Sequence, residues 1–207
     1  MKAVLLAGGP VTPTRGLLER LRGAALVVAA DGGVRHARPL GLTPDIIVGD
    51  FDSATPEELA PFAGVPRQVH PPRKDLLDLE LAAAEAERQG ASELLFVGAL
   101  GGRFDQSLAA LFIAMRLRER LTVSLHSGWS AAYPLVAGDA LTLELPQGQR
   151  FSLLSLEPAR LSLTGASYPL TRALLPFGVG LGVSNEVAAS PLTVTLHEGR
   201  AFLVLDC

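Results

Sequence analysis

The sequence predicts an α/β fold in which a doubly wound, mostly parallel sheet domain is followed by a C-terminal antiparallel β-sandwich domain. In the first 130 residues or so, short apolar runs without alternation are separated by helical patterns, which is typical of strands covered on both faces. Later in the chain, apolar and polar residues alternate and Gly/Pro turns separate the runs, which is typical of antiparallel sheets.

The predicted parallel strands are the apolar runs at 3–8, 25–30, 45–50, 93–100 and 121–127, with a candidate edge strand at 66–71. The helices expected between them cover 13–22, 33–40, 56–62, 75–89 and 105–120. Thr55, followed by Pro56 and Glu58, predicts a capping box with proline at the first helical position. Together these elements predict a doubly wound α/β domain.

The alternating runs of the second part lie at 140–146, 150–157, 159–165, 191–199 and 200–206. They are rich in Leu, Thr and Val, which suits a sandwich or a barrel. Turn residues cluster at 128–139, where the pattern changes, so we expect the domain boundary there. We therefore assign residues 1–132 to the α/β domain and residues 133–207 to the β domain.

Composition excludes several classes of protein. With 48% hydrophobic and 19% charged residues, the chain of 207 residues can form a packed core. No run reaches the roughly 18 apolar residues that a membrane span needs. A net charge of −3 and the lack of a basic run give no electrostatic reason to expect binding to nucleic acid or to a membrane surface.

The cysteine and the N-terminus bear on the compartment. Cys207 is the single cysteine, which excludes a disulfide within the chain and a thiolate zinc site. The four histidines lie too far apart for a local metal motif. The first residues, MKAVLLAGGPVTP, are expected to form a buried strand rather than a signal peptide. We expect a cytoplasmic protein.

Acidic residues gather at the ends of the predicted strands. Asp31 ends the second strand, Asp50 and Asp52 end the third, and the segment 101–105 follows the strand at 93–100. Ligands of an open parallel sheet bind beyond the carboxyl ends of its strands. Asp78 lies near the start of the long helix, where the helix dipole favours acids. We therefore expect these segments to meet at one ligand site.

Such a cluster needs a compensating charge. If Asp50 and Asp52 stay extended, their side chains point the same way, about 7 Å apart. Their repulsion is then roughly 2–3 kcal/mol at an effective dielectric constant of about 20. Oxygen ligands favour Mg²⁺ or Ca²⁺ over zinc. Gly101 and Gly102 leave backbone N–H groups open to a phosphate, and Arg103 adds a bidentate cation.

Each feature also has a plainer structural explanation. Asp50 could be a turn residue, and Asp75 could be the N-cap of the long helix. Glu80, Glu85 and Glu87 are expected on the solvated face of that helix. The convergence of four acidic or Gly-rich segments at one end of the sheet favours a functional site.

The motifs, taken in order, resemble those of the thiamine pyrophosphokinase (thiamine diphosphokinase) family over almost the whole chain. The stretch ADGGVRHARPLGLTPDIIVGDFDS (30–53) resembles the family's Asp-Gly-Gly, Pro-Asp and Gly-Asp-Phe-Asp-Ser segments. KDLLDLELA (74–82) resembles its Lys-Asp-x-Thr-Asp-x-Glu-x-Ala helix start, and GGRFDQSLAAL (101–111) its Gly-Arg-x-Asp segment. TGASYPLTRALLPFGVGLGVSNEV (164–187) resembles its Tyr-Pro-Leu stretch and Ser-Asn motif.

The resemblance implies an ATP-dependent diphosphotransferase. It would transfer pyrophosphate from ATP to the hydroxyl of thiamine, giving thiamine diphosphate and AMP with Mg²⁺ as cofactor. Nucleotide and Mg²⁺ would bind to the α/β domain and thiamine to the β domain. The implied assembly is a homodimer with active sites between its subunits.

The resemblance also implies the roles of individual residues. The Mg²⁺ ligands would be Asp50, Asp52 and Asp78. The nucleotide and its phosphates would contact Asp31, Gly32, Gly101, Gly102, Arg103 and Asp105. The thiamine pyrimidine would contact Ser184 and Asn185, and Tyr168 or Phe202 would offer an aromatic face to the thiazolium unless it only packs. The catalytic candidates are Asp52, Asp78 and Asp105, of which Asp78 or Asp105 would accept the hydroxyl proton.

Three residues depart from the family pattern. Leu77 replaces a threonine, Ala110 an asparagine and Gln106 the common histidine, so polar contacts are lost at the first two positions. Two alternatives to thiamine diphosphokinase therefore stay open. One is a diphosphokinase for another alcohol, such as a hydroxymethylpterin, and the other is a non-catalytic sensor that binds thiamine or a nucleotide.

Overall fold

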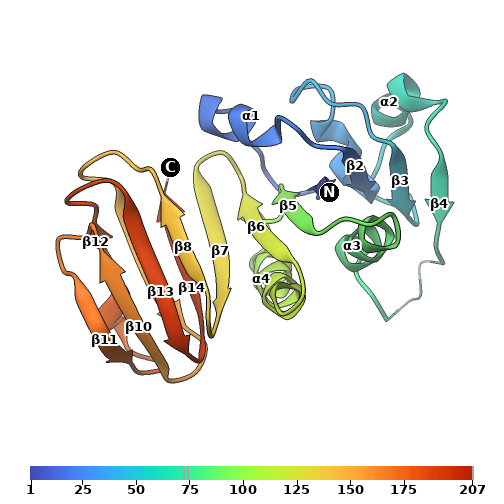
Figure 1. Ribbon diagram of the computed structural model, residues 1–207. Helices are drawn as coiled ribbons and strands as arrows, with labels where there is room; N and C mark the ends of the chain where they lie inside the picture. The colour runs from blue at the N-terminus through green and yellow to red at the C-terminus, as the bar shows by residue number, and fades with distance from the viewer. Residues whose placement is uncertain (72, 74, 207) are drawn as a thin grey trace. The chain divides into compact units, whose positions relative to one another are not determined.

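A parallel sheet forms the centre of the first part of the chain in the computed structural model, which describes residues 1–71, 73 and 75–206 (Figure 1). Pro72, Lys74 and Cys207 lie outside the described residues, and with them the lysine of the 74–82 motif and the cysteine. The strands pair in the order β6-β5-β1-β2-β3-β4. They are β1 (Lys2–Leu6), β2 (Leu26–Ala30), β3 (Ile46–Gly49), β4 (Arg67–Val69), β5 (Glu93–Val97) and β6 (Thr122–His126).

Helices cover both faces of this sheet (Figure 1). One face carries α1 (Arg15–Leu21), η1 (Asp31–His36), α2 (Pro56–Leu59) and η2 (Ala60–Phe62), and the other carries α3 (Asp78–Arg88) and α4 (Phe104–Arg118). Neighbouring residues of β1 face opposite ways, and both Leu5 and Leu6 are fully buried. A strand covered on both faces is expected to be a nearly continuous apolar run. This confirms the doubly wound α/β domain predicted from the apolar runs.

The strand order reverses beside β1. The chain runs from β1 through β2 and β3 to the edge strand β4, and then crosses through α3 to β5, which pairs in parallel with the other edge of β1. In open parallel sheets, ligands bind at such a switch point, beyond the carboxyl ends of the strands. The fold therefore places the segments after β1, β2 and β5 around the expected site.

Some local predictions were wrong. The helix expected at 33–40 is a 3-10 helix that already begins at Asp31, and the helix expected from residue 75 begins at Asp78 with Leu77, not Asp75, as N-cap. The capping box at Thr55 is confirmed. The chain does not stay extended through Asp50 and Asp52, because β3 ends at Gly49 and Phe51 has a left-handed φ of 63°.

Two antiparallel sheets form the second part of the chain. The first orders its strands β12-β9-β14-β7 and the second β11-β10-β13-β8. The strands are β7 (Ser130–Val136), β8 (Ala140–Leu143), β9 (Arg150–Ser155), β10 (Ala159–Thr164), β11 (Leu170–Leu175), β12 (Asn185–Glu186), β13 (Leu192–Glu198) and β14 (Arg200–Asp206). Alternate residues share one core, for example Leu161 and Leu163 of β10 with Leu203 and Leu205 of β14. This confirms the predicted β-sandwich.

The chain divides after Trp129 into an α/β unit and a β unit, whereas the sequence suggested a boundary after residue 132. The segment interpreted as turns contains β7, whose residues Ala131, Tyr133 and Leu135 face the core of the β unit. The strands β11 and β12 were not predicted either. Among the described residues, no helix is long and apolar enough to cross a membrane.

Candidate active site

A pocket of about 610 Å³ opens at the carboxyl ends of the parallel strands. Its lining comes from the loops after β1 and β5, the end of β2, the start of α3 and the first turns of α4. The lining segments are 7–10, 30–32, 76–79 and residues of 98–103, together with Arg35, Ser53, Gln106 and Ala110. The switch point of the sheet is therefore hollow, as the topology predicts.

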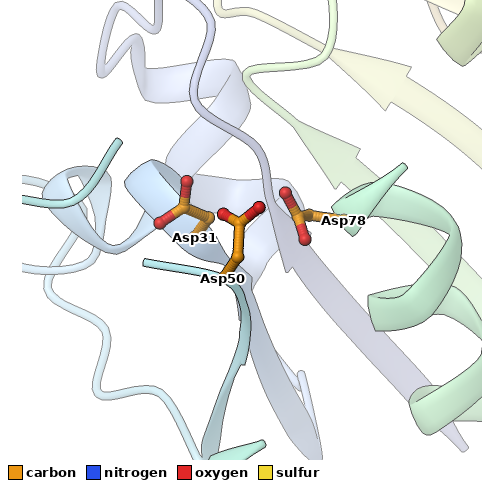
Figure 2. A group of neighbouring side chains, drawn as sticks. All are labelled: Asp31, Asp50 and Asp78. Carbon is orange, nitrogen blue, oxygen red and sulfur yellow. The ribbon is translucent and has the colours of Figure 1, made fainter. Parts of the chain in front are cut away.

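Three aspartates from separate elements meet beside this pocket. Figure 2 shows the carboxylates of Asp31, Asp50 and Asp78 turned toward one another. Asp31 follows β2, Asp50 follows β3, and Asp78 is the first residue of α3. One oxygen of each carboxylate lies within 4.8 Å of the others. The predicted convergence of acidic segments is present, with Asp31 as a member in place of Asp52.

The backbone around the cluster explains how the acids come so close. Asp31 has a left-handed φ of 43°, and its Oδ2 accepts a hydrogen bond of 3.1 Å from the backbone N–H of Ser53. Gly49 has a φ of 152°, and a Cβ added there would lie 2.9 Å from Cβ of Asp31 and 3.2 Å from Oδ1 of Asp78. Only glycine tolerates both this conformation and this contact. Gly49 therefore leaves the room that the cluster occupies.

Asp31 is buried without full compensation. It is 4% exposed, and its Oδ1 has no hydrogen-bond partner in the described part of the chain. Burial raises the pKa of this carboxyl, hydrogen bonds from Ser53 oppose the rise, and the negative charge of Asp78 adds to it. Such an unpaired buried oxygen is costly unless a cation meets it. Three convergent carboxylates suit a hard divalent ion such as Mg²⁺ or Ca²⁺.

Asp52 lies outside this group. The left-handed φ of Phe51 breaks the strand alternation that would have pointed Asp50 and Asp52 the same way. Asp52 is exposed, and its carboxylate accepts a hydrogen bond of 2.8 Å from the hydroxyl of Ser53. Its backbone N–H contacts Oδ1 of Asp50 at 3.4 Å. The two aspartates thus stay linked, but Asp52 faces solvent.

The loop after β5 supplies the cationic side of the pocket. Gly101 and Gly102 have φ values of 84° and 69°, so the backbone turns close to Pro10 without a side chain between them. Arg103 lines the pocket and forms two hydrogen bonds, of 2.6 and 3.2 Å, with the carboxylate of Asp105. Those bonds lower the pKa of Asp105. Asp105 itself is not among the lining residues.

The three departures from the family pattern all line the pocket. Leu77 is the N-cap of α3, and Gln106 and Ala110 lie on the first turns of α4. Leucine and alanine give the wall of the pocket an apolar patch where the family pattern has polar groups. The loss of the threonine also leaves the start of α3 without a side-chain N-cap.

The residues predicted to bind thiamine gather on the β unit. The side chain of Asn185 accepts a hydrogen bond from the backbone N–H of Tyr168 and donates one to its carbonyl, at 3.2 and 3.1 Å. Ser184 is exposed beside Asn185, with a left-handed φ of 62°. The ring of Tyr168 is exposed, whereas Phe202 is buried in β14 and offers no aromatic face. Asn185 therefore fixes the loop that presents Tyr168.

Sequence reasoning missed some residues of the pocket. Arg35 donates hydrogen bonds to the carbonyls of Gly32 (2.7 Å) and Ser53 (3.0 Å) and lies 3.4 Å from Glu58. It thereby ties the end of β2 to the loop after β3, next to Asp31. The segment 7–10 was also missed as a lining segment. Its position directly after β1 could have identified it, because the rule that ligands bind beyond the carboxyl ends of the strands also identified Asp31.

Comparison with known proteins gives the family. The model of the thiamin pyrophosphokinase catalytic domain matches residues 17–125, and that of the thiamin pyrophosphokinase vitamin B1 binding domain matches residues 141–200. The chain belongs to the thiamin pyrophosphokinase family. A thiamine pyrophosphokinase from Bacillus subtilis (strain 168) is 26% identical over 211 residues, which cover 99% of this chain and 98% of the relative. The family predicted from the motifs is confirmed.

Solved structures of family members share the fold. The crystal structure of thiamine pyrophosphokinase from Bacillus subtilis has a TM-score of 0.87 at 23% identity, covering 100% of this chain and 99% of that chain. The thiamin pyrophosphokinase from Geobacillus thermodenitrificans has a TM-score of 0.84 at 24% identity, covering 100% and 98%. That from Candida albicans has a TM-score of 0.79 at 16% identity, covering 100% and 90%. At these identities the likeness concerns the fold alone.

Proposed function

We propose that this member of the thiamin pyrophosphokinase family transfers the pyrophosphoryl group of ATP to the hydroxyl oxygen of thiamine and releases AMP. The observation that carries the proposal is the convergence of Asp31, Asp50 and Asp78 beside a pocket at the switch point of the sheet. Enzymes that transfer phosphoryl groups act mainly by positioning and by neutralising charge. Both requirements fit an acidic cluster that faces a glycine- and arginine-lined loop.

The acidic cluster is the proposed metal site. Asp31, Asp50 and Asp78 fit a hard divalent ion because each offers a carboxylate oxygen and, within the described residues, Oδ1 of Asp31 is buried without a hydrogen-bond partner. When bound, Mg²⁺ would supply positive charge that neutralises and orients the phosphates of ATP. We keep Asp52 as a further ligand and catalytic residue, because its exposed carboxylate can bind the ion that accompanies the nucleotide.

The nucleotide is proposed to occupy the pocket of the α/β unit. The Gly101–Gly102 backbone and the guanidinium of Arg103 would hold its phosphates, and Asp31 and Gly32 line the same pocket. The thiamine oxygen attacks the β-phosphorus in line, and AMP leaves with the electrons of the broken P–O bond. Asp78 or Asp105 would accept the hydroxyl proton, and hydrogen bonds from Arg103 lower the pKa of Asp105, which weakens it as a base.

Thiamine is proposed to bind to the β unit through Ser184, Asn185 and the ring of Tyr168. A cationic thiazolium over an exposed aromatic ring gains about 0.5–2 kcal/mol. We further propose a cytoplasmic homodimer in which the pocket of one subunit receives thiamine from the β unit of the other. Exposed apolar side chains support a subunit contact near the Ser-Asn motif. They are Phe177, Val179, Leu181 and Val183.

The test is AMP release from Mg-ATP by the purified protein. We expect AMP and thiamine diphosphate only when thiamine is present, and no AMP when a chelator replaces Mg²⁺. AMP release with a hydroxymethylpterin but not with thiamine would point to a diphosphokinase of another alcohol. Thiamine binding by calorimetry without any AMP would point to a sensor. Either result would refute the proposed function.

A further inference from the structure

Glu80 makes two contacts that bear directly on the start of α3. Its Oε2 accepts a hydrogen bond of 3.1 Å from the backbone N–H of Leu77, the N-cap residue. Its Oε1 accepts one of 2.8 Å from Nη2 of Arg116 on α4. The side chain is only 14% exposed. The prediction that Glu80 lies on the solvated face of α3 was therefore wrong. It was also wrong for Glu85, which is only 4% exposed.

The start of α3 depends on this side chain. A helix N-terminus leaves backbone N–H groups unsatisfied, and an N-cap side chain usually accepts from one of them. Leu77 has no polar side chain, so only the Glu80 half of a capping box is present. Asp78 lies between the two residues of this half-box, as the first residue of the helix. Any loss of order in this turn moves the carboxylate of Asp78.

Arg116 holds Glu80 in place from α4. The same helix carries Gln106 and Ala110 of the pocket wall. The contact thus connects the two helices whose N-terminal turns line the pocket. Because both carboxylate oxygens of Glu80 are used, its rotamer is fixed from two directions. Charge-assisted hydrogen bonds of this kind are about twice as strong as neutral ones.

We propose that Glu80, anchored by Arg116, is a positioning residue that sets the Leu77–Asp78 turn and so aims the carboxylate of Asp78 at Asp31 and Asp50. The inference rests on the proposed function of that cluster as a metal site. It adds a residue that does not contact the metal or the substrate. Supporting residues around metal ligands commonly change metal affinity about 10–100-fold when they are removed.

The chain contains a matched control. Glu87 lies two turns further along α3 and binds Arg120 with hydrogen bonds of 2.7 and 2.9 Å. Its side chain is 26% exposed. This pair has the same chemistry as Glu80–Arg116 but is remote from Asp78. Removing either pair takes one Glu–Arg contact from α3, and only removal of the Glu80 pair frees the first turn.

The experiment measures binding of Mn²⁺, as a spectroscopic substitute for Mg²⁺, to the nucleotide-free protein by electron paramagnetic resonance. For Glu80→Ala we expect Kd for Mn²⁺ to rise about tenfold, at the lower end of supporting-residue effects. For Glu87→Ala we expect a change of less than about twofold, because no metal-site contact is involved. Glu80→Gln should lie between wild type and Glu80→Ala, because its amide oxygen can still accept from the Leu77 N–H.

Thermal unfolding of the same variants separates positioning from general destabilisation. If Glu80→Ala does not fold, Glu80→Gln and Arg116→Gln carry the test. Equal Mn²⁺ affinity in Glu80→Ala and wild type, or an equal loss in Glu80→Ala and Glu87→Ala, would overturn the inference. Absence of Mn²⁺ binding in the wild type itself would refute the proposed metal site, and the inference with it. The two failures are therefore distinguishable.

Discussion

Replacing Asp31 by asparagine should stabilise the metal-free protein while it removes function. Asp31 is buried in a cluster of like charges, and its Oδ1 has no hydrogen-bond partner among the described residues. Asparagine keeps the oxygen that accepts from Ser53. Its NH₂ group would stand in place of Oδ1 and could donate to the neighbouring carboxylates. The substitution thus exchanges a repulsion for hydrogen bonds.

The size of the effect follows from the spacing. Two unit charges 4.8 Å apart repel by about 3.5 kcal/mol at an effective dielectric constant of about 20. Neutralising Asp31 removes two of the three pairs. The folded wild type can relieve this repulsion by protonating Asp31, which at about pH 7 costs about 4 kcal/mol for a carboxyl of normal pKa. The expected increase in the free energy of unfolding of Asp31→Asn is therefore about 1–4 kcal/mol, which corresponds to a rise in Tm of at least about 2–4 °C.

The gain should depend on pH with a definite sign. Because burial raises the folded pKa of Asp31, the folded protein binds its proton more readily than the unfolded chain does. The contribution of Asp31 to wild-type stability therefore falls as pH rises from the unfolded pKa, about 3.9, through the raised folded pKa. The advantage of Asp31→Asn is full above the folded pKa and disappears below the unfolded one.

The assay is calorimetric Tm in a chelator and in millimolar Mg²⁺. We expect Asp31→Asn to melt above wild type in the chelator, and to gain less from Mg²⁺ than wild type gains. Asp45→Asn is the control, since Asp45 is exposed and its Oδ2 accepts from the Val27 N–H, so its Tm should not rise. An Asp31→Asn protein that melts at or below wild type in the chelator would show that the cluster carries no electrostatic strain.

Three further outcomes are expected. Burial lowers the pKa of His126 to about 3. Its contribution to the free energy of unfolding should therefore fall as pH drops below about 6.5, by up to about 4–5 kcal/mol. In unfolding titrations at different pH, His126→Gln should show a smaller decline than wild type. Gly49→Ala should weaken Mn²⁺ binding at least about tenfold, because its Cβ would push Asp31 and Asp78 apart. Asp52→Asn should fold normally and lose most turnover, while Mn²⁺ binding to the nucleotide-free protein stays close to wild type, unlike that of Asp50→Asn.

The parallel sheet was predictable because burial on both faces leaves little choice of residue. Each central strand consists mostly of an apolar run, such as 3–6 in β1 and 94–97 in β5, and Asp31 and Asp50 directly follow β2 and β3. The rule that ligands bind beyond the carboxyl ends of strands then brings Asp31, Asp50 and the 101–105 segment to one place. In the β unit the signal was weaker. In β7, alanines, a serine and a proline obscure the alternation that places Ala131, Tyr133 and Leu135 in the core.

The membership of the acidic cluster was harder to predict. Sequence spacing pairs Asp50 with Asp52 only if the chain stays extended, and the left-handed φ of Phe51 breaks that condition. The inward direction of Asp31 depends equally on a left-handed φ of 43°. Such conformations are uncommon outside glycine, and periodicity gives no sign of them. Likewise, the role of Glu80 depends on Arg116, which lies 36 residues away.

Bonds to neighbouring groups fix the segments that carry the three acids. The Ser53 N–H bonds to Asp31, and Arg35 ties Ser53 to the end of β2. Glu80 fixes the turn that carries Asp78. Each acid-bearing segment is thus fixed by contacts that need no cation. The carboxylates can therefore stay close together before a metal binds. The favourable free energy of folding offsets the repulsion between their charges. A site built in this way should bind its ion with little rearrangement, and should lose affinity when a supporting contact is removed even though every carboxylate remains.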